Sequence, residues 1–236
     1  MSIAGNIERV REIIAEAAEK SGRSADDVLL LAVTKLHEPS EMNEAIDAGA
    51  TDIGENKVQE ILAKYDKVKP VRWHLIGHLQ TNKVRQVIDK VVMIHSVDSL
   101  HLAKEIEKRA DQAGITMDIL IQVDPAEQDT KFGVDPKDLY GLINDISESC
   151  PHVRVRGLMC IAPFYEDPED TRPFFREVKG LYDKCREDFD GASNVDFRYL
   201  SMGMTNDFRV AVEEGSNLVR VGTAIFGYRD YRKEEK

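Results

Sequence analysis

Residues 28–35 read Val-Leu-Leu-Leu-Ala-Val-Thr-Lys, an apolar run of strand length that ends in two polar residues. A strand that is apolar on both faces is typical of a parallel sheet covered by helices. Pro39-Ser40 then opens a helical pattern that ends at Gly49. The stretch therefore predicts a strand followed by a crossover helix, with Lys35 where the strand ends.

The same alternation of strand and helix repeats along the whole chain. Counting residues 28–33 first, the pattern predicts eight strands, the others at 51–53, 72–76, 91–95, 118–123, 153–157, 197–200 and 218–221. Helical spacing is found between them at 39–49, 58–65, 82–90, 99–113, 136–149, 171–189 and 205–214. Residues 3–21 predict one further helix before the first strand.

Eight strand–helix units in about 230 residues match an α/β fold of the (β/α)8 TIM barrel type. A doubly wound open sheet is the alternative, but it usually has about five to seven strands, and the Gly-x-Gly-x-x-Gly fingerprint is absent. No linker or low-complexity tract divides the chain, residues 162–170 are the longest loop candidate, and 233–236 form a charged tail. We expect residues 1–236 to form a single barrel domain with an extra N-terminal helix.

Composition narrows the function classes. The net charge of −11 opposes a nucleic-acid partner, although one phosphate could still bind to backbone N–H groups. No apolar run approaches the roughly 20 residues that span a bilayer, and the N-terminus does not resemble a secretory signal. The three cysteines lack metal-type spacing. We expect a cytoplasmic protein with no metal, no nucleic acid and no membrane partner.

Residues that follow the strands are the candidate site, because barrel enzymes and binding proteins use that face. Lys35 ends a fully apolar strand, where an amine can act as a nucleophile, although a lone lysine there more often reaches into solvent. Ser201-Met202-Gly203 and Gly222-Thr223 follow the last two strands, at the usual phosphate position of this fold. Small residues and hydroxyls suit an anion, but they also occur in ordinary turns.

His74 and His78 have an H-x-x-x-H spacing, which suits a metal only when both lie on one helix face. Gly77 and the strand pattern at 72–76 argue against a helix here. We therefore predict no metal pair and expect His74 to line the pocket.

Several motifs occur together in a known order: Ala-Val-Thr-Lys at 32–35, Gly-Glu-Asn at 54–56, Trp-His-Leu-Ile-Gly-His-Leu-Gln-Thr-Asn-Lys at 73–83, Ser-Met-Gly-Met at 201–204 and Val-Arg-Val-Gly-Thr at 219–223. The chain resembles the pyridoxal phosphate homeostasis proteins, also described as YggS-like or PROSC-like, over nearly its whole length. The blocks at 73–83 and 201–204 are the most specific.

The resemblance implies a fold-type III barrel similar to the N-terminal domain of alanine racemase, with pyridoxal 5′-phosphate as its cofactor. It implies that Lys35 carries the Schiff base and that Arg220 faces the pyridine nitrogen. It further implies phosphate-binding positions at Ser201, Gly222 and Thr223, and cofactor-lining positions at Asn56, His74 and Met202. Such proteins take part in the homeostasis of vitamin B6 and amino acids. Apo forms of pyridoxal phosphate enzymes are their candidate recipients.

Two positions depart from the family pattern. Thr34-Lys35-Leu36-His37 replaces the commoner Ser-Lys-Thr-Lys, so a second lysine found in some members is missing. Thr205 stands where serine is usual, which keeps the hydroxyl.

The residues favour a carrier over an enzyme. An arginine at the pyridine nitrogen stays charged and cannot accept a proton, so the ring would stabilise carbanions poorly. Racemisation also needs a second base, and nothing in the sequence places Tyr228 or Tyr231 opposite Lys35. We expect no catalytic residues and a monomer, since the racemase's second domain is missing. The alternatives are a fold-type III amino-acid racemase or related enzyme, and a Schiff-base aldolase without the cofactor.

Overall fold

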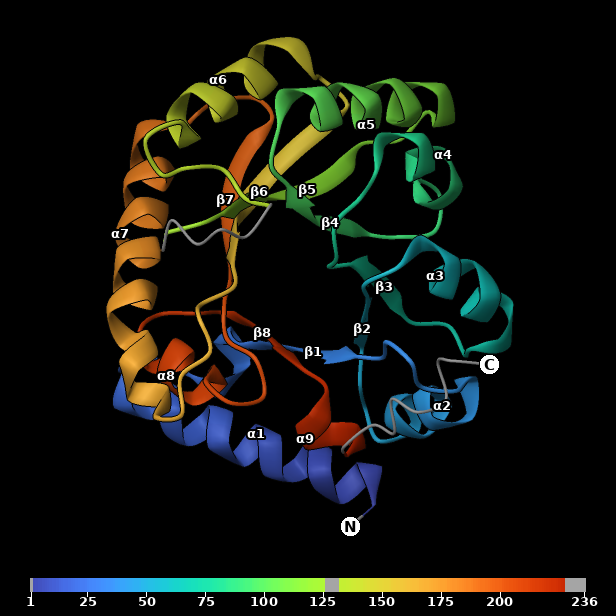
Figure 1. Ribbon diagram of the computed structural model, residues 1–236, viewed down its shortest axis with the longest axis vertical. Helices are drawn as coiled ribbons and strands as arrows, with labels where there is room; N and C mark the ends of the chain where they lie inside the picture. The colour runs from blue at the N-terminus through green and yellow to red at the C-terminus, as the bar shows by residue number, and fades with distance from the viewer. Residues whose placement is uncertain (1, 126–131, 228–236) are drawn as a thin grey trace.

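The computed structural model describes residues 2–125 and 132–227. Eight parallel strands form a closed barrel in sequence order, with β1 also paired to β8 (Figure 1). The strands are β1 (Leu29–Val33), β2 (Asp52–Glu55), β3 (Arg72–Leu75), β4 (Met93–Val97), β5 (Met117–Val123), β6 (Val153–Cys160), β7 (Val195–Ser201) and β8 (Leu218–Val221). The predicted (β/α)8 barrel is confirmed, and all eight predicted strands are present with small shifts at their ends.

Helices surround the barrel, and their capping follows local sequence. Ser99 accepts a hydrogen bond from the Leu102 N–H at the start of one helix, and Gly114 ends it in the left-handed conformation with φ 66°. The helices are α1 (Ile3–Lys20), α2 (Pro39–Asp47), α3 (Val58–Lys64), α4 (Val84–Val87), α5 (Leu100–Ala113), α6 (Leu139–Ser149), α7 (Arg172–Asp188), α8 (Phe208–Glu213) and α9 (Thr223–Phe226).

Two expected helices are present but shorter than predicted, and one residue was misplaced. The helix expected at 82–90 is a short 3-10 turn followed by α4, and the first residues of the helix expected at 205–214 form a turn before α8. Met159, expected after the sixth strand, lies inside β6, because register shifts against β5 and β7 accommodate a longer strand. The short helix α9 was not predicted. Tyr228, Tyr231 and the charged tail lie outside the described residues.

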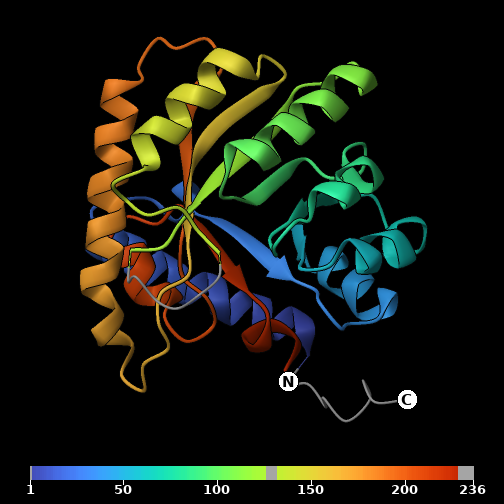
Figure 2. The same cartoon turned by 45° about the horizontal axis from the view of Figure 1, so that its top comes forward.

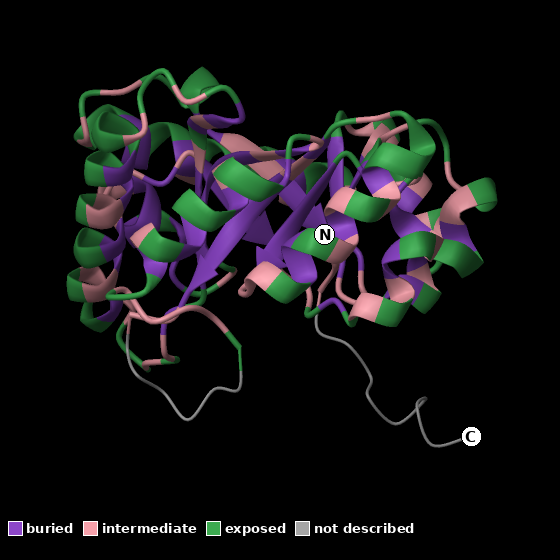
Figure 3. Ribbon diagram, turned by 90° about the horizontal axis from the view of Figure 1, so that it is seen from above, coloured by how far each residue is buried: buried purple, intermediate pink, exposed green. Residues whose placement is uncertain are grey.

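Apolar side chains fill two regions of the molecule. The larger one lies between the strands and the helices, so the strands are buried and the outward helix faces are exposed (Figure 3). The smaller one fills the barrel interior with two groups, Leu31–Val33–Leu218 and Met93–Leu120–Met159, and Tyr199 packs against both. The middle of the barrel is therefore a packed core.

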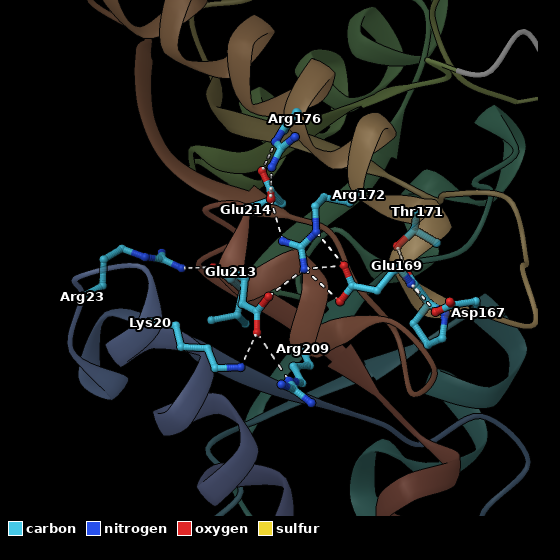
Figure 4. A network of polar contacts seen from close by, with 12 residues as sticks. Lys20, Arg23, Asp167, Glu169, Thr171, Arg172, Arg176, Arg209, Glu213 and Glu214 are labelled. Atoms are coloured by element: carbon cyan, nitrogen blue, oxygen red, sulfur yellow. Dashed lines mark hydrogen bonds and ion pairs between the residues drawn. The ribbon is translucent and has the colours of Figure 1, made fainter.

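The first helix lies beside two helices from the other end of the described chain. α1 packs against α8 and α9 (Figures 1 and 2), and the Asn6 side chain donates to the Ile225 carbonyl at 2.8 Å. An ion-pair network joins α1, α7 and α8, in which Glu213 binds both Lys20 and Arg172 and Glu214 binds Arg172 (Figure 4). Within the described ranges, no helix is long and apolar enough to cross a membrane.

Candidate cofactor site

A cavity of about 520 Å³ opens at the carboxyl ends of the strands. Its walls come from the ends of β1, β2, β3, β5, β6, β7 and β8 and from the loops after them. Five residues predicted from the sequence line it: Lys35, Asn56, Arg220, Gly222 and Thr223. The volume falls in the range of about 300–1,000 Å³ that small-molecule sites occupy.

Lys35 stands in a tight turn directly after β1. The His37 N–H donates to the Thr34 carbonyl at 3.1 Å, which closes a four-residue turn with Lys35 in its second position. Leu36, the third residue, has φ 64°. A positive φ at that position is the mark of a type II turn, which usually takes glycine or asparagine there. The lysine side chain reaches the cavity from this turn and is half-buried.

Arg220 forms the inner end of the cavity. Its Nη1 donates to the Ser201 carbonyl at 2.9 Å and to the Ser201 hydroxyl at 2.6 Å, and its Nη2 donates to the Cys160 carbonyl at 2.8 Å. These bonds join β8 to β7 and β6 across the barrel and fix the guanidinium plane. Burial lowers the pKa of Arg220 and raises the pKa of Cys160 to about 12. The site therefore contains one fixed cation and no thiolate at Cys160 near neutral pH.

Hydroxyl and amide groups gather where β7 and β8 end. Thr205 and Asn206 line the cavity from the loop after β7, and Gly222 and Thr223 line it from the start of α9. The Thr205 hydroxyl accepts from the Ala224 N–H at 3.4 Å, which ties the two loops together. N–H groups in the first turn of a helix have no partner within the helix, so this corner can bind an anion.

The remaining predicted residues lie outside the cavity lining. Ser201 is buried, and its hydroxyl accepts a hydrogen bond from the Arg220 guanidinium, which it helps to hold in place. Met202 is buried in the core between strands and helices. Their roles in cofactor binding stay predictions.

His74 shares a strand face with Ile76, which does line the cavity, so His74 lies one layer deeper in the barrel. Its Nε2 pairs with Asp52 at 2.8 Å and its Nδ1 with His95 at 2.9 Å. Burial raises the pKa of Asp52, but hydrogen bonds from His74 and Arg72 more than offset this and hold that pKa below its ordinary value. Burial, with the charges of His74 and Arg220, also holds the pKa of His95 well below its ordinary value. A role for His74 at the cofactor stays a prediction.

Some lining residues were not assigned to the site from the sequence. Thr205 and Asn206, in the loop after β7, were expected only to cap the following helix beside the anion, and they line the cavity themselves. Gln122 ends β5 and Ile161 follows β6, where the strand-end rule applies but the residue types suggest no chemistry. His78 also lines the cavity, and its ring stacks on Phe132 with centroids 3.9 Å apart.

No group of three or more His, Cys, Asp or Glu side chains within residues 2–125 and 132–227 is arranged to hold a metal ion. The cavity thus combines an amine, a fixed guanidinium, a hydroxyl-rich corner and apolar walls. This set can bind an aromatic phosphate that carries a carbonyl group.

Known proteins resemble this chain in sequence and in fold. The family described as alanine racemase, N-terminal domain, matches residues 5–230. A pyridoxal phosphate homeostasis protein of Aquifex aeolicus is 44% identical over 233 residues, which are 98% of this chain and 100% of the relative. The protein of that name in Escherichia coli strain K12 is 35% identical over 242 residues, covering 98% of this chain and 99% of the relative.

Solved structures agree with the sequence relatives. PipY of Synechococcus elongatus PCC7942, in a structure with PLP bound, superposes on this chain with a TM-score of 0.81 at 32% identity. The match covers 96% of this chain and 100% of the PipY chain. An alanine racemase of Clostridium difficile 630 shares the fold alone, with a TM-score of 0.72 at 14% identity over 97% of this chain and 57% of that one. The chain therefore belongs to the family of pyridoxal phosphate homeostasis proteins, built on the barrel of the alanine racemase N-terminal domain.

Proposed function

We propose that the protein binds pyridoxal 5′-phosphate in the cavity at the strand ends and takes part in its homeostasis. The observation that carries this proposal is the placement of Lys35, Arg220 and Thr223 in one cavity, although they come from opposite ends of the chain. PipY, a relative at 32% identity, has a structure with PLP bound.

The residues present fit this cofactor. Gly222, Thr223 and the loop that contains Thr205 would hold its phosphate, since hydroxyls and helix-start N–H groups suit a dianion. Arg220, whose guanidinium is fixed by Ser201 and Cys160, would face the pyridine ring. Lys35 would face the aldehyde group.

When bound, pyridoxal phosphate supplies an aldehyde that condenses with a primary amine. Lys35 is the primary amine of the cavity lining that would condense with this aldehyde, with release of water. Lys35 would in this way hold the cofactor by a covalent link that needs no redox partner.

A carrier role without turnover is supported better than an enzyme. Arg220 is held by carbonyl groups and remains a cation, so it would not supply or accept the proton that an electron-sink ring requires. Racemisation would need a second base. Among the described lining residues His78 is the one that could serve, but its ring is stacked on Phe132. We propose a cytoplasmic, monomeric barrel spanning residues 1–236, with apo forms of pyridoxal phosphate enzymes as recipients.

Borohydride trapping tests the tether directly. The wild-type protein mixed with pyridoxal phosphate and reduced should gain one phosphopyridoxyl group on Lys35, located by peptide mass. Lys35→Ala should lose this adduct, and Lys57→Ala, an exposed lysine next to Asn56, should keep it. An equal adduct in Lys35→Ala would disprove the tether. Amino-acid turnover clearly above that of Lys35→Ala would favour the racemase alternative.

A further inference from the structure

A buried ion cluster lies behind the turn that carries Lys35. The Lys64 ammonium lies 2.9 Å from Glu55 Oε1 and 2.7 Å from Glu60 Oε2. Glu55 is fully buried at the end of β2, and Lys64 in α3 is 9% exposed. Buried ion pairs seldom stabilise a fold more than packed apolar side chains do, so such a cluster points to a local task. We name Glu55, Glu60 and Lys64 the turn clamp.

Each member of the turn clamp bonds to the backbone or side chain of a residue beside Lys35. Lys64 Nζ donates to the Thr34 carbonyl at 3.1 Å, and the Thr34 hydroxyl donates to Glu55 Oε1 at 2.7 Å. Glu60 Oε2 accepts from the Leu36 N–H at 2.7 Å. The clamp therefore grips the chain on both sides of Lys35.

The turn is strained where Glu60 holds it. Leu36 is the only residue other than glycine with positive φ in the described parts of the chain, at 64°. A leucine in that conformation is strained, because its Cβ approaches the following carbonyl oxygen. Its side chain is 40% exposed, so packing offers little compensation. The hydrogen bond to Glu60 is the contact that fixes this peptide group.

We infer that Glu55, Glu60 and Lys64 are positioning residues that hold the 34–37 turn and thereby direct Lys35 into the cavity. The inference rests on the proposed role of Lys35. Lys64 itself is no competing amine, because its three N–H protons have three acceptors in Thr34, Glu55 and Glu60.

Comparing the binding of two ligands separates a loss of Lys35 positioning from general damage to the cavity. Pyridoxine 5′-phosphate has the ring and the phosphate of pyridoxal phosphate but an alcohol in place of the aldehyde, so it cannot bond to Lys35. Glu60→Ala should weaken pyridoxal phosphate binding by about tenfold, the factor that corresponds to the strain at Leu36. Pyridoxine phosphate should bind that variant as it binds the wild type, because the groups proposed to hold its phosphate follow β7 and β8 and do not touch the turn clamp.

A second substitution tests the cause. Asparagine tolerates positive φ far better than leucine, so Leu36→Asn added to Glu60→Ala should restore most of the lost affinity. Glu60→Gln keeps an oxygen for the Leu36 N–H and should bind within about threefold of wild type. Glu105→Ala, which removes another i,i+4 ion pair, is the matched control and should leave the affinity for both ligands unchanged.

The outcomes are distinct. Equal weakening of both ligands in Glu60→Ala, or no rescue by Leu36→Asn, would overturn the clamp and leave the tether intact. If Glu60→Ala does not fold, a loss of pyridoxal phosphate in Glu60→Gln without rescue by Leu36→Asn would overturn it as well. A wild-type protein that bound both ligands equally would overturn the tether and the clamp together.

Discussion

At the scale of single residues, Gly203 shows how tightly the loop after β7 is built. It has φ +95°, and a Cβ there would lie 2.6 Å from the Ala211 Cβ and 2.8 Å from the Phe208 Cα. Its carbonyl accepts from the Arg220 N–H at 3.0 Å. The glycine therefore lets this loop pack on α8 while it pairs with β8 beside the cavity.

Gly203→Ala should lower the free energy of unfolding by about 2–4 kcal/mol, from backbone strain and overpacking together. Gly180→Ala is the matched control, because Gly180 lies within α7 with no atom within 4 Å of its would-be Cβ. It should raise stability by about 0.5–1 kcal/mol. Urea denaturation of both variants would measure the two effects, and a Gly203→Ala protein as stable as wild type would contradict this account of the loop.

At the scale of elements, the contact between β2 and α3 makes stability depend on pH. Burial raises the pKa of Glu55 to about 7, and although the charge of Lys64 lowers it, that of Glu60 raises it further. In the unfolded chain this carboxyl has its ordinary value of 4.5. Between these values the folded protein holds a proton that the unfolded chain has lost, so this contribution to stability is complete below pH 4.5 and disappears toward pH 7.

Glu55→Gln has no carboxyl to titrate, so it should not show this loss of stability as the pH rises. From pH 4.5 to 8 the variant should gain stability relative to wild type by on the order of 2 kcal/mol. The difference is the useful quantity, because Asp52, with its lowered pKa, contributes with the opposite sign in both proteins. Thermal denaturation across that pH range measures it, and a difference that does not vary with pH would refute the raised pKa.

The elements also show how far the sequence could be read. Period-two and period-3.6 patterns predicted the barrel, and the strand-end rule brought Lys35, Asn56 and Thr223 to one face. Alternation along a strand tells which face a side chain takes but not its depth, so His74 could not be separated from the cavity lining. The turn clamp was not predicted, because it joins residues up to 30 positions apart through the fold.

At the scale of the whole molecule, the network around Glu213 and Glu214 connects the first helix to the last third of the chain. Arg172 binds both carboxylates, Arg176 binds Glu214, and Lys20 reaches Glu213 from α1 (Figure 4). The two glutamates are only 14% and 12% exposed, so solvent screens these pairs less than ordinary surface pairs.

The double variant Glu213→Gln/Glu214→Gln should therefore lose about 1–3 kcal/mol of stability. Lys69→Ala, which breaks the exposed pair with Asp47, should change it by less than about 1 kcal/mol. Guanidinium would screen the charges, so urea is the denaturant for this measurement. Equal effects of the two changes would show that the network adds nothing beyond surface pairing.

The pairing of β1 with β8, and of α1 with α8 and α9, also bears on synthesis of the protein. The ribosome makes β1 early, with one edge and both apolar faces lacking their final partners. That edge finds β8 only after residue 221 has left the exit tunnel. Until then an apolar strand edge stays open to pairing with other chains, which makes the nascent polypeptide a candidate for chaperone protection until β8 emerges.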